Sequence, residues 1–175
     1  MEKLTIISGT NRPQSYTQKV AKYYHSIFSQ QEAEVKFLSL EMLPPDFLFS
    51  NTFGNRTKEF QELIDEYILA SEKYIFILPE YNGSFPGILK GFLDAVPPNY
   101  WTNKKAALVG VAQGRAGNLR GIEQLTLVLN YLKVFVHHQK IPISIVDSLF
   151  DEKGFLFHEP TQKILNAQKE AFLRF

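Results

Sequence analysis

Cysteine is absent from this sequence of 175 residues, so disulfides, thiolate nucleophiles and zinc–thiolate sites are excluded. An excess of one charge is also lacking, because 19 lysine and arginine residues stand against 18 aspartate and glutamate residues. Such a balance gives no field that would attract nucleic acid or an anionic membrane. No apolar run approaches the ~20 residues that span a bilayer, and the amino terminus shows no leader pattern. We therefore predict a cytoplasmic chain with neither a nucleic-acid nor a membrane partner.

Histidine offers little material for a metal site. His137 and His138 are adjacent in a segment typical of a strand, which would point their side chains to opposite faces. His25 and His158 stand alone in the sequence. We predict no metal centre.

Aromatic residues, in contrast, are abundant. They make up 14% of the chain, more than a small α/β core requires, so we expect some of them to line a pocket or an interface. The segment 43–55 carries Phe47, Phe49 and Phe53 without a regular period and reads as an irregular loop. Two interpretations of its aromatics stay open: packing under the loop as a satellite of the core, or covering a ligand or a second subunit.

Runs with strand character alternate with amphipathic helical patterns along the chain. The clearest run, Tyr74–Leu78, has no polar alternation, which is typical of a strand buried on both faces of a parallel sheet. The five expected strands lie at 4–8, 34–40, 74–78, 106–112 and within 134–145, and the five expected helices lie at about 18–28, 57–68, 88–93, 119–133 and 161–172.

This alternation predicts one doubly wound α/β domain over residues 1–175. We expect a three-layer α/β/α sandwich around a five-stranded parallel sheet of order 2-1-3-4-5. The strand order reverses between the first and third strands, and ligands of such sheets bind outside the carboxyl ends of the strands at that point. The loops 9–17 and 79–87 would face each other there.

The first of these loops has the residue types of a phosphate site. Thr10, Ser15 and Thr17 bring hydroxyls, Arg12 brings a guanidinium, and a helix begins directly afterwards with free N–H groups and a positive dipole end. Neither the Walker pattern nor Gly-x-Gly-x-x-Gly is present, so a monophosphate fits better than a nucleoside triphosphate or a dinucleotide. In the alternative interpretation, Ser15 is only a helix cap and Thr10 and Arg12 are solvated.

The second loop can present backbone N–H and C=O groups to a flat ring with polar edges. Pro79 and Pro86 restrict its freedom, while Gly83 and Gly87 permit close approach. As an alternative, these residues are merely turn formers, which would leave the Glu-Tyr-Asn set between them unexplained.

Together the two loops resemble those of the NADPH-dependent FMN reductase family of flavodoxin-like proteins. Gly9, Thr10, Arg12 and Ser15 match the family's first-loop pattern, and the segment 79–90 matches its Pro-Glu-Tyr-Asn-x-Ser-x-Pro-Gly-x-Leu-Lys motif nearly in full. The glycine-rich turn 114–117 is a weaker match, and Asn118 follows it where a second glycine is common in the family.

The resemblance implies a flavodoxin-like fold and an FMN-dependent oxidoreductase that takes hydride from NADPH or NADH and reduces a small-molecule acceptor such as a flavin or quinone. It assigns Thr10, Arg12, Ser15 and Thr17 to the FMN phosphate. It places Pro79, Glu80, Tyr81 and Asn82 along the isoalloxazine ring with Ser84 nearby, and Gly114 and Arg115 along the pyrimidine edge. No side chain is implied as a catalytic acid or base, because the flavin carries the chemistry.

The resemblance also implies a homodimer or homotetramer with the flavin near a subunit boundary, where Tyr81, Phe85, Tyr100 and Trp101 would be covered. Two other functions stay open. One is an FMN electron carrier without its own NAD(P)H turnover, although such carriers tend to be strongly acidic. The other is a sensor or scaffold that kept the fold without turnover.

Overall fold

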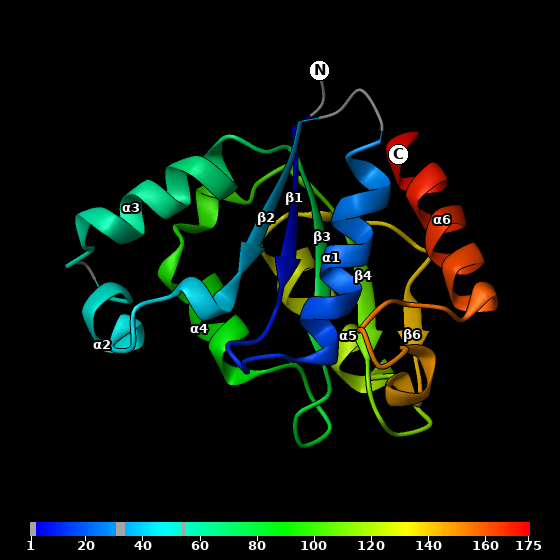
Figure 1. Cartoon of the computed structure of the whole chain (residues 1–175). Helices are drawn as coiled ribbons and strands as arrows, with labels where there is room; N and C mark the ends of the chain where they lie inside the picture. Colours follow the sequence, from blue (N-terminus) through cyan, green and yellow to red (C-terminus); the bar gives the residue numbers. More distant parts are fainter. Residues whose placement is uncertain (1–2, 31–33, 54) are drawn as a thin grey trace.

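The sheet organises the computed structural model, which describes residues 3–30, 34–53 and 55–175. Its strands run parallel in the order β2-β1-β3-β4-β5, with β6 also paired to β4, and Figure 1 shows them at the centre of the molecule. Their bounds are β1 Lys3–Ser8, β2 Glu34–Ser39, β3 Lys73–Pro79, β4 Lys105–Val111, β5 Phe135–Val136 and β6 Ile141–Ile143. The strand order that the sequence predicts is therefore confirmed.

The number of strands differs from the prediction, because the expected fifth strand is split in two. The chain leaves the sheet after Val136 and returns at Ile141, so β5 pairs with the start of β4 and β6 with its end. The buried side chain of Gln168 fills the gap: its Nε2 donates to Leu108 O at 3.2 Å and to Gln139 O at 2.7 Å. A helix side chain thus satisfies the carbonyl that a continuous fifth strand would have paired.

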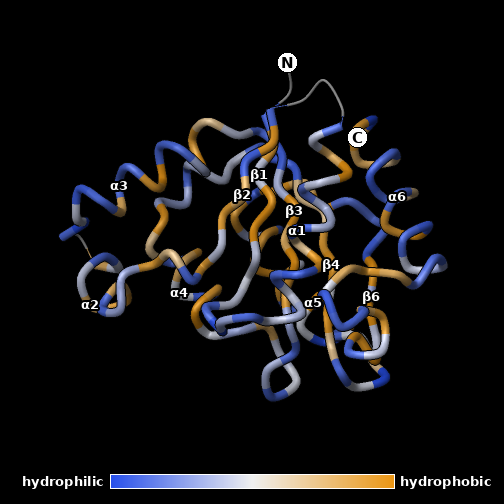
Figure 2. Tube along the Cα trace, viewed as in Figure 1, coloured by the Kyte–Doolittle hydropathy of each residue, from blue (hydrophilic) through white to orange (hydrophobic). Residues whose placement is uncertain are grey.

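Helices cover both faces of the sheet (Figure 1). One face packs against α1 Tyr16–Phe28 and α6 Glu159–Leu173, and the other against α3 Lys58–Ile64, α4 Gly87–Ala95 and α5 Leu119–Tyr131. A wider helical turn, Asp65–Leu69, continues α3. All five expected helices are present, and Figure 2 shows apolar residues gathered along the strands between the two helical layers.

The segment 43–55 is not wholly irregular, because it contains a short helix that was not expected, α2 Phe47–Asn51. Phe47 is buried against Phe60, with ring centroids 5.3 Å apart, so the packing interpretation holds for this side chain. Phe49 and Phe53 are each 95% exposed. Within α2, Phe47 thus packs into the core while Phe49 is exposed, and Phe53, just after the helix, is exposed as well.

Two further expectations are wrong. Trp101 does not lie at a surface that a subunit could cover, because it is buried among the rings of Tyr74, Phe76 and Phe92. His137 and His138 do not point to opposite faces. They lie where the chain has left the sheet, and their ring centroids are 4.5 Å apart. Within the described part of the chain, no helix has the length and apolar character needed to cross a bilayer.

Candidate functional site

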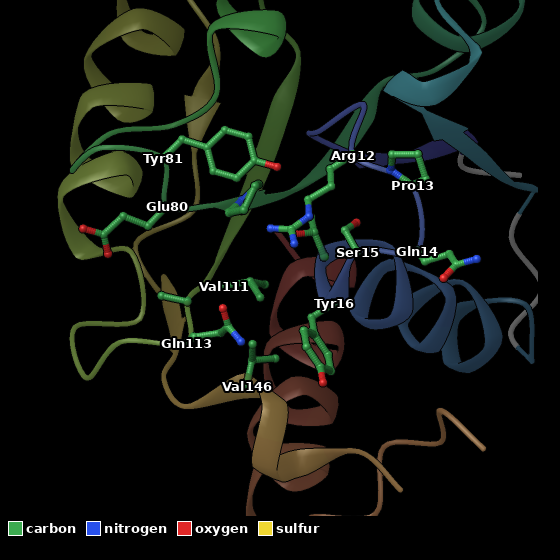
Figure 3. A pocket seen from close by; sticks show the side chains of 13 residues that line it. Arg12, Pro13, Gln14, Ser15, Tyr16, Glu80, Tyr81, Val111, Gln113 and Val146 are labelled. Carbon is green, nitrogen blue, oxygen red and sulfur yellow. The ribbon is translucent and has the colours of Figure 1, made fainter. Parts of the chain in front are cut away.

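A cavity of about 300 Å³ opens at the carboxyl ends of β1, β3 and β4. Figure 3 shows side chains from three loops converging on it, with Arg12 and Tyr81 above and Tyr16 and Val146 below. The lining residues are Arg12, Pro13, Gln14, Ser15, Tyr16, Thr17, Pro79, Glu80, Tyr81, Val111, Ala112, Gln113 and Val146. The switch point predicted from the strand order therefore holds a real cavity.

The loop after β1 delivers the first turn of α1 to this cavity. Ser15 is the N-cap in an extended conformation, and its Oγ accepts a hydrogen bond from Gln18 N at 3.1 Å. Gln14 just before it adopts a left-handed φ of 53°, which turns the chain sharply into the helix. The buried Thr17 lies in the first turn and lines the cavity beside Arg12. A helix N-terminus, a hydroxyl and a guanidinium are a donor set that suits an anion.

The loop after β3 is a tight hairpin. Tyr81 N donates to Ser84 O at 2.9 Å and Ser84 N donates to Tyr81 O at 3.1 Å, which leaves two residues in the turn. Those residues, Asn82 and Gly83, have φ values of 53° and 77°. Positive φ at both central positions is the type I′ geometry for which Asn-Gly is the preferred sequence. The turn residues therefore fix the shape of the rim next to Tyr81.

The two loops are joined by their side chains. The hydroxyl of Thr10, which is buried, lies 2.8 Å from the hydroxyl of Tyr81 and also accepts from Arg12 N at 3.2 Å. Thr10 thus does not line the cavity itself but fixes two residues that do.

Asn118, which follows the loop after β4, links the start of α5 to the end of β3. This buried N-cap of α5 has a left-handed φ of 64°, donates from Nδ2 to Leu78 O at 3.0 Å and accepts at Oδ1 from Gly121 N at 3.1 Å. The left-handed conformation explains why a glycine would also suit this position. Through Asn118, the start of α5 is tied to the end of β3 at the cavity.

Charge is sparse inside the site. Among the described residues that line the cavity, Arg12 and Glu80 are the only charged ones. In Figure 3 the Glu80 carboxylate points away from Arg12, and its Oε1 lies 3.6 Å from Nη1 of Arg120 on α5. Ser84 Oγ contacts Gln124 Oε1 one turn further along the same helix. The inner cavity is therefore left with the positive charge of Arg12.

The structure brings most of the predicted site residues together. Those that line the cavity are Arg12, Ser15, Thr17, Pro79, Glu80 and Tyr81. Thr10 lies behind them, while Asn82 and Ser84 belong to the hairpin beyond Tyr81. Gly114 and Arg115 lie in an exposed turn and do not line the cavity.

Several lining residues were not predicted: Pro13, Gln14, Tyr16, Val111, Ala112, Gln113 and Val146. Most of them lie inside or beside loops that the sequence analysis had singled out. A prediction that every residue of these loops lines the cavity would have included them. Val146 is different, because it follows the split last strand and only the three-dimensional fold brings it to Tyr16.

Comparison with known proteins adds a family to this geometry. A family model described as NADPH-dependent FMN reductase matches residues 2–145. A 2-hydroxy-1,4-benzoquinone reductase from a Burkholderia species is 27% identical over 168 residues, covering 93% of this chain and 90% of the relative. An FMN-dependent NADPH-azoreductase of Staphylococcus aureus is 31% identical over 176 residues, covering 92% and 94%.

Among solved structures, the flavoenzyme NAD(P)H:(acceptor) oxidoreductase of Paracoccus denitrificans superposes with a TM-score of 0.81. The match covers 99% of this chain and 96% of that one at 24% identity, a level that supports the fold alone.

Proposed function

The chain belongs to the NADPH-dependent FMN reductase family, and on that premise we propose that it holds FMN in the cavity, accepts hydride from NADPH or NADH and reduces a small organic molecule. The observation that carries this proposal is the N-terminal turn of α1, which lines the cavity beside Arg12 at the switch point of the sheet and suits an anion.

The donor set of the first loop fits the phosphate of FMN. We assign the phosphate to the N-terminal turn of α1, with the Arg12 guanidinium and the hydroxyls of Ser15 and Thr17 as side-chain partners. Thr10 takes part by fixing Arg12 N and Tyr81. The Glu80 carboxylate points away from Arg12 and does not neutralise its positive charge. A phosphate bound at the start of α1 would do so.

The second and third loops fit the flavin ring. Pro79, Glu80 and Tyr81 form one wall of the cavity, and Val111, Ala112 and Gln113 form the wall beside it. Asn82 and Ser84 shape the rim through the hairpin, and Gly114 and Arg115 extend it on the other side. FMN, when bound, supplies the redox chemistry; these residues bind and orient it and exclude water from its buried edge.

The acceptor we propose is a quinone or an azo compound. The relatives named above act on a benzoquinone and on azo compounds according to their names, and both match over nine-tenths of this chain.

An electron carrier without NAD(P)H turnover stays the second candidate. The near balance of charges disfavours it, since such carriers rely on a strong acidic field for docking to partners.

We also propose that the protein is a homodimer that associates through α4 and α5. A mainly apolar groove of about 390 Å³ lies between these helices, lined by Leu93, Val96, Pro98, Val128 and Leu132 among others. Leu127 and Tyr131 also line it, and they are 70% and 85% exposed. These exposed side chains and the groove lie on the same face, so two copies related by a two-fold axis present complementary surfaces to each other.

Sedimentation tests this interface. Tyr131→Glu on its own should convert the dimer to a monomer, whereas Phe155→Glu, at another exposed aromatic residue that does not line the groove, should not. A homotetramer would need a second apolar surface, for which Phe49 and Phe53 are the candidates.

The cytoplasm, where reduced nicotinamide nucleotides are formed, remains the location we propose.

An absorption spectrum tests the function. The purified protein, supplied with FMN, is mixed anaerobically with NADPH or NADH and then with a benzoquinone. Bleaching of the flavin bands and their return on adding quinone are expected. Bound FMN that neither nucleotide bleaches would indicate the electron carrier, and failure to bind FMN would contradict both.

A further inference from the structure

Arg120 lies on the outer side of the hairpin that borders the cavity. It belongs to the first turn of α5, and its Nη1 is 3.6 Å from Oε1 of Glu80. The side chain remains 69% exposed, so its guanidinium faces solvent as well as Glu80. A cation therefore stands next to the cavity without contributing to its lining.

The side chain of Arg120 lies close to the hairpin turn as well as to Glu80. A Cβ on Gly83 would lie 3.9 Å from Cδ of Arg120, so the aliphatic stem of the arginine runs along the turn. One helical turn later, Gln124 contacts Ser84 on the same hairpin. The stem thus passes near the hairpin, while the guanidinium is largely exposed to solvent.

The ion pair itself is a weak reason for an arginine at this place. It consists of one long contact at an exposed position, and such pairs contribute little to stability. A phosphate would make shorter, charge-assisted and bidentate hydrogen bonds with the same guanidinium. An incoming phosphate can therefore displace Glu80 from Arg120 at small cost.

We propose that Arg120 is a phosphate receptor for the nicotinamide dinucleotide donor, and that Glu80 is its partner when no donor is bound. The inference rests on the proposed function, which fills the cavity of about 300 Å³ with FMN. A dinucleotide that approaches a flavin held there must carry its phosphates outside the cavity walls, and Arg120 stands on the outer side of one of them. The phosphate is either the 2′-phosphate, found only in NADPH, or the diphosphate common to both donors.

Titration calorimetry of NADP⁺ and NAD⁺ into the FMN-loaded protein tests the proposal without turnover. Arg120→Met removes the charge and keeps an unbranched stem. We expect it to weaken NADP⁺ binding roughly tenfold or more, the usual effect of losing a hydrogen bond to a charged group. NAD⁺ binding unchanged would identify the 2′-phosphate, and an equal loss for NAD⁺ would identify the diphosphate.

Two further variants make the test specific. Arg174→Met removes an exposed arginine at the end of α6, which lies at the amino ends of β3 and β4 and so away from the cavity, and should leave both affinities unchanged. Glu80→Gln removes the competing carboxylate and should bind NADP⁺ at least as tightly as the parent protein.

The proposal is overturned if Arg120→Met binds both nucleotides as the parent does. It is also overturned if Arg120→Met loses FMN affinity, or if Glu80→Gln weakens NADP⁺ as much as Arg120→Met does, because either result would make the pair a structural brace. Failure of the proposed function is recognised separately, as a flavin that neither NADPH nor NADH bleaches.

Discussion

The hydroxyl of Tyr81 lies 2.8 Å from the hydroxyl of Thr10, and this hydrogen bond joins two loops beside the cavity at positions 71 residues apart in sequence. Thr10 belongs to the loop that leads into α1, where we propose the phosphate site, and Tyr81 begins the hairpin that forms the rim. The two loops are distant in sequence and follow the paired strands β1 and β3. The hydrogen bond therefore forms only when these strands pair. The start of α1 and the rim are therefore positioned as one unit.

Replacing Tyr81 with phenylalanine should loosen that unit. The Thr10 hydroxyl keeps Arg12 N as a partner, so the expected loss of unfolding free energy is small, about 1 kcal/mol. We expect a larger effect on FMN, with a dissociation constant several-fold higher. Urea denaturation and quenching of FMN fluorescence measure the two. Tyr131→Phe, on an exposed tyrosine away from the cavity, is the matched control, and an equal change there would contradict the role of the hydroxyl.

Arg12→Gln should weaken the anion site selectively. Loss of a charge-assisted hydrogen bond to phosphate costs about 1.5–3 kcal/mol, so we expect FMN to bind roughly ten- to a hundredfold more weakly. Riboflavin lacks the phosphate and should bind the variant and the parent protein alike. Fluorescence titration of both flavins gives the comparison, and an equal loss for riboflavin would place Arg12 against the ring instead of the phosphate.

The strand order and the cavity could be predicted from the sequence because both follow from local patterns. Tyr74–Leu78 is apolar throughout, as a central parallel strand must be, and it is followed at once by the Pro-Glu-Tyr-Asn loop. Asn82-Gly83 encodes its own turn type without help from the rest of the fold. Local chemistry was sufficient in these places.

The features that escaped prediction depend on partners distant in sequence. The break between β5 and β6 is filled by Gln168, which is 29 residues beyond Gln139 and looks in sequence like any polar helix residue. Trp101 follows a proline-rich turn typical of the surface, and only packing against Tyr74 and Phe92 reveals it as core. Val146 reaches the cavity because the split strand ends beside α1.

Asn118 offers a test of the tie between α5 and β3. Asn118→Ala loses both side-chain hydrogen bonds, leaves Leu78 O without that donor and forces alanine into a left-handed φ. We expect about 2–4 kcal/mol less unfolding free energy from the lost bonds and the backbone strain together. Asn118→Gly loses the same bonds without the strain, so it should be about 1 kcal/mol more stable than the alanine variant. Urea denaturation ranks the three proteins, and a glycine variant no better than alanine would contradict the strain argument.

Stability should fall in mild acid because of His137. Burial among Phe172, Phe175 and the neighbouring His138 lowers the pKa of His137 below its ordinary value, since desolvation disfavours the imidazolium. As the pH drops below about 6.5, the unfolded chain takes up a proton at this position that the folded chain refuses, so the unfolded state is stabilised. The loss continues until the pH passes the lowered pKa of the folded protein.

His137→Gln should therefore shrink the difference in melting temperature between pH 8 and pH 5, even if it lowers both values. His25 is a half-buried histidine of α1 that packs against Phe37 on β2, far from His137. His25→Gln should keep the full difference in melting temperature between the two pH values. Calorimetric melting curves at the two pH values provide the measurement. If the His137 variant retained the parent's pH dependence, the acid sensitivity would have to come from other groups, and the contact between His137 and His138 would be a packing feature alone.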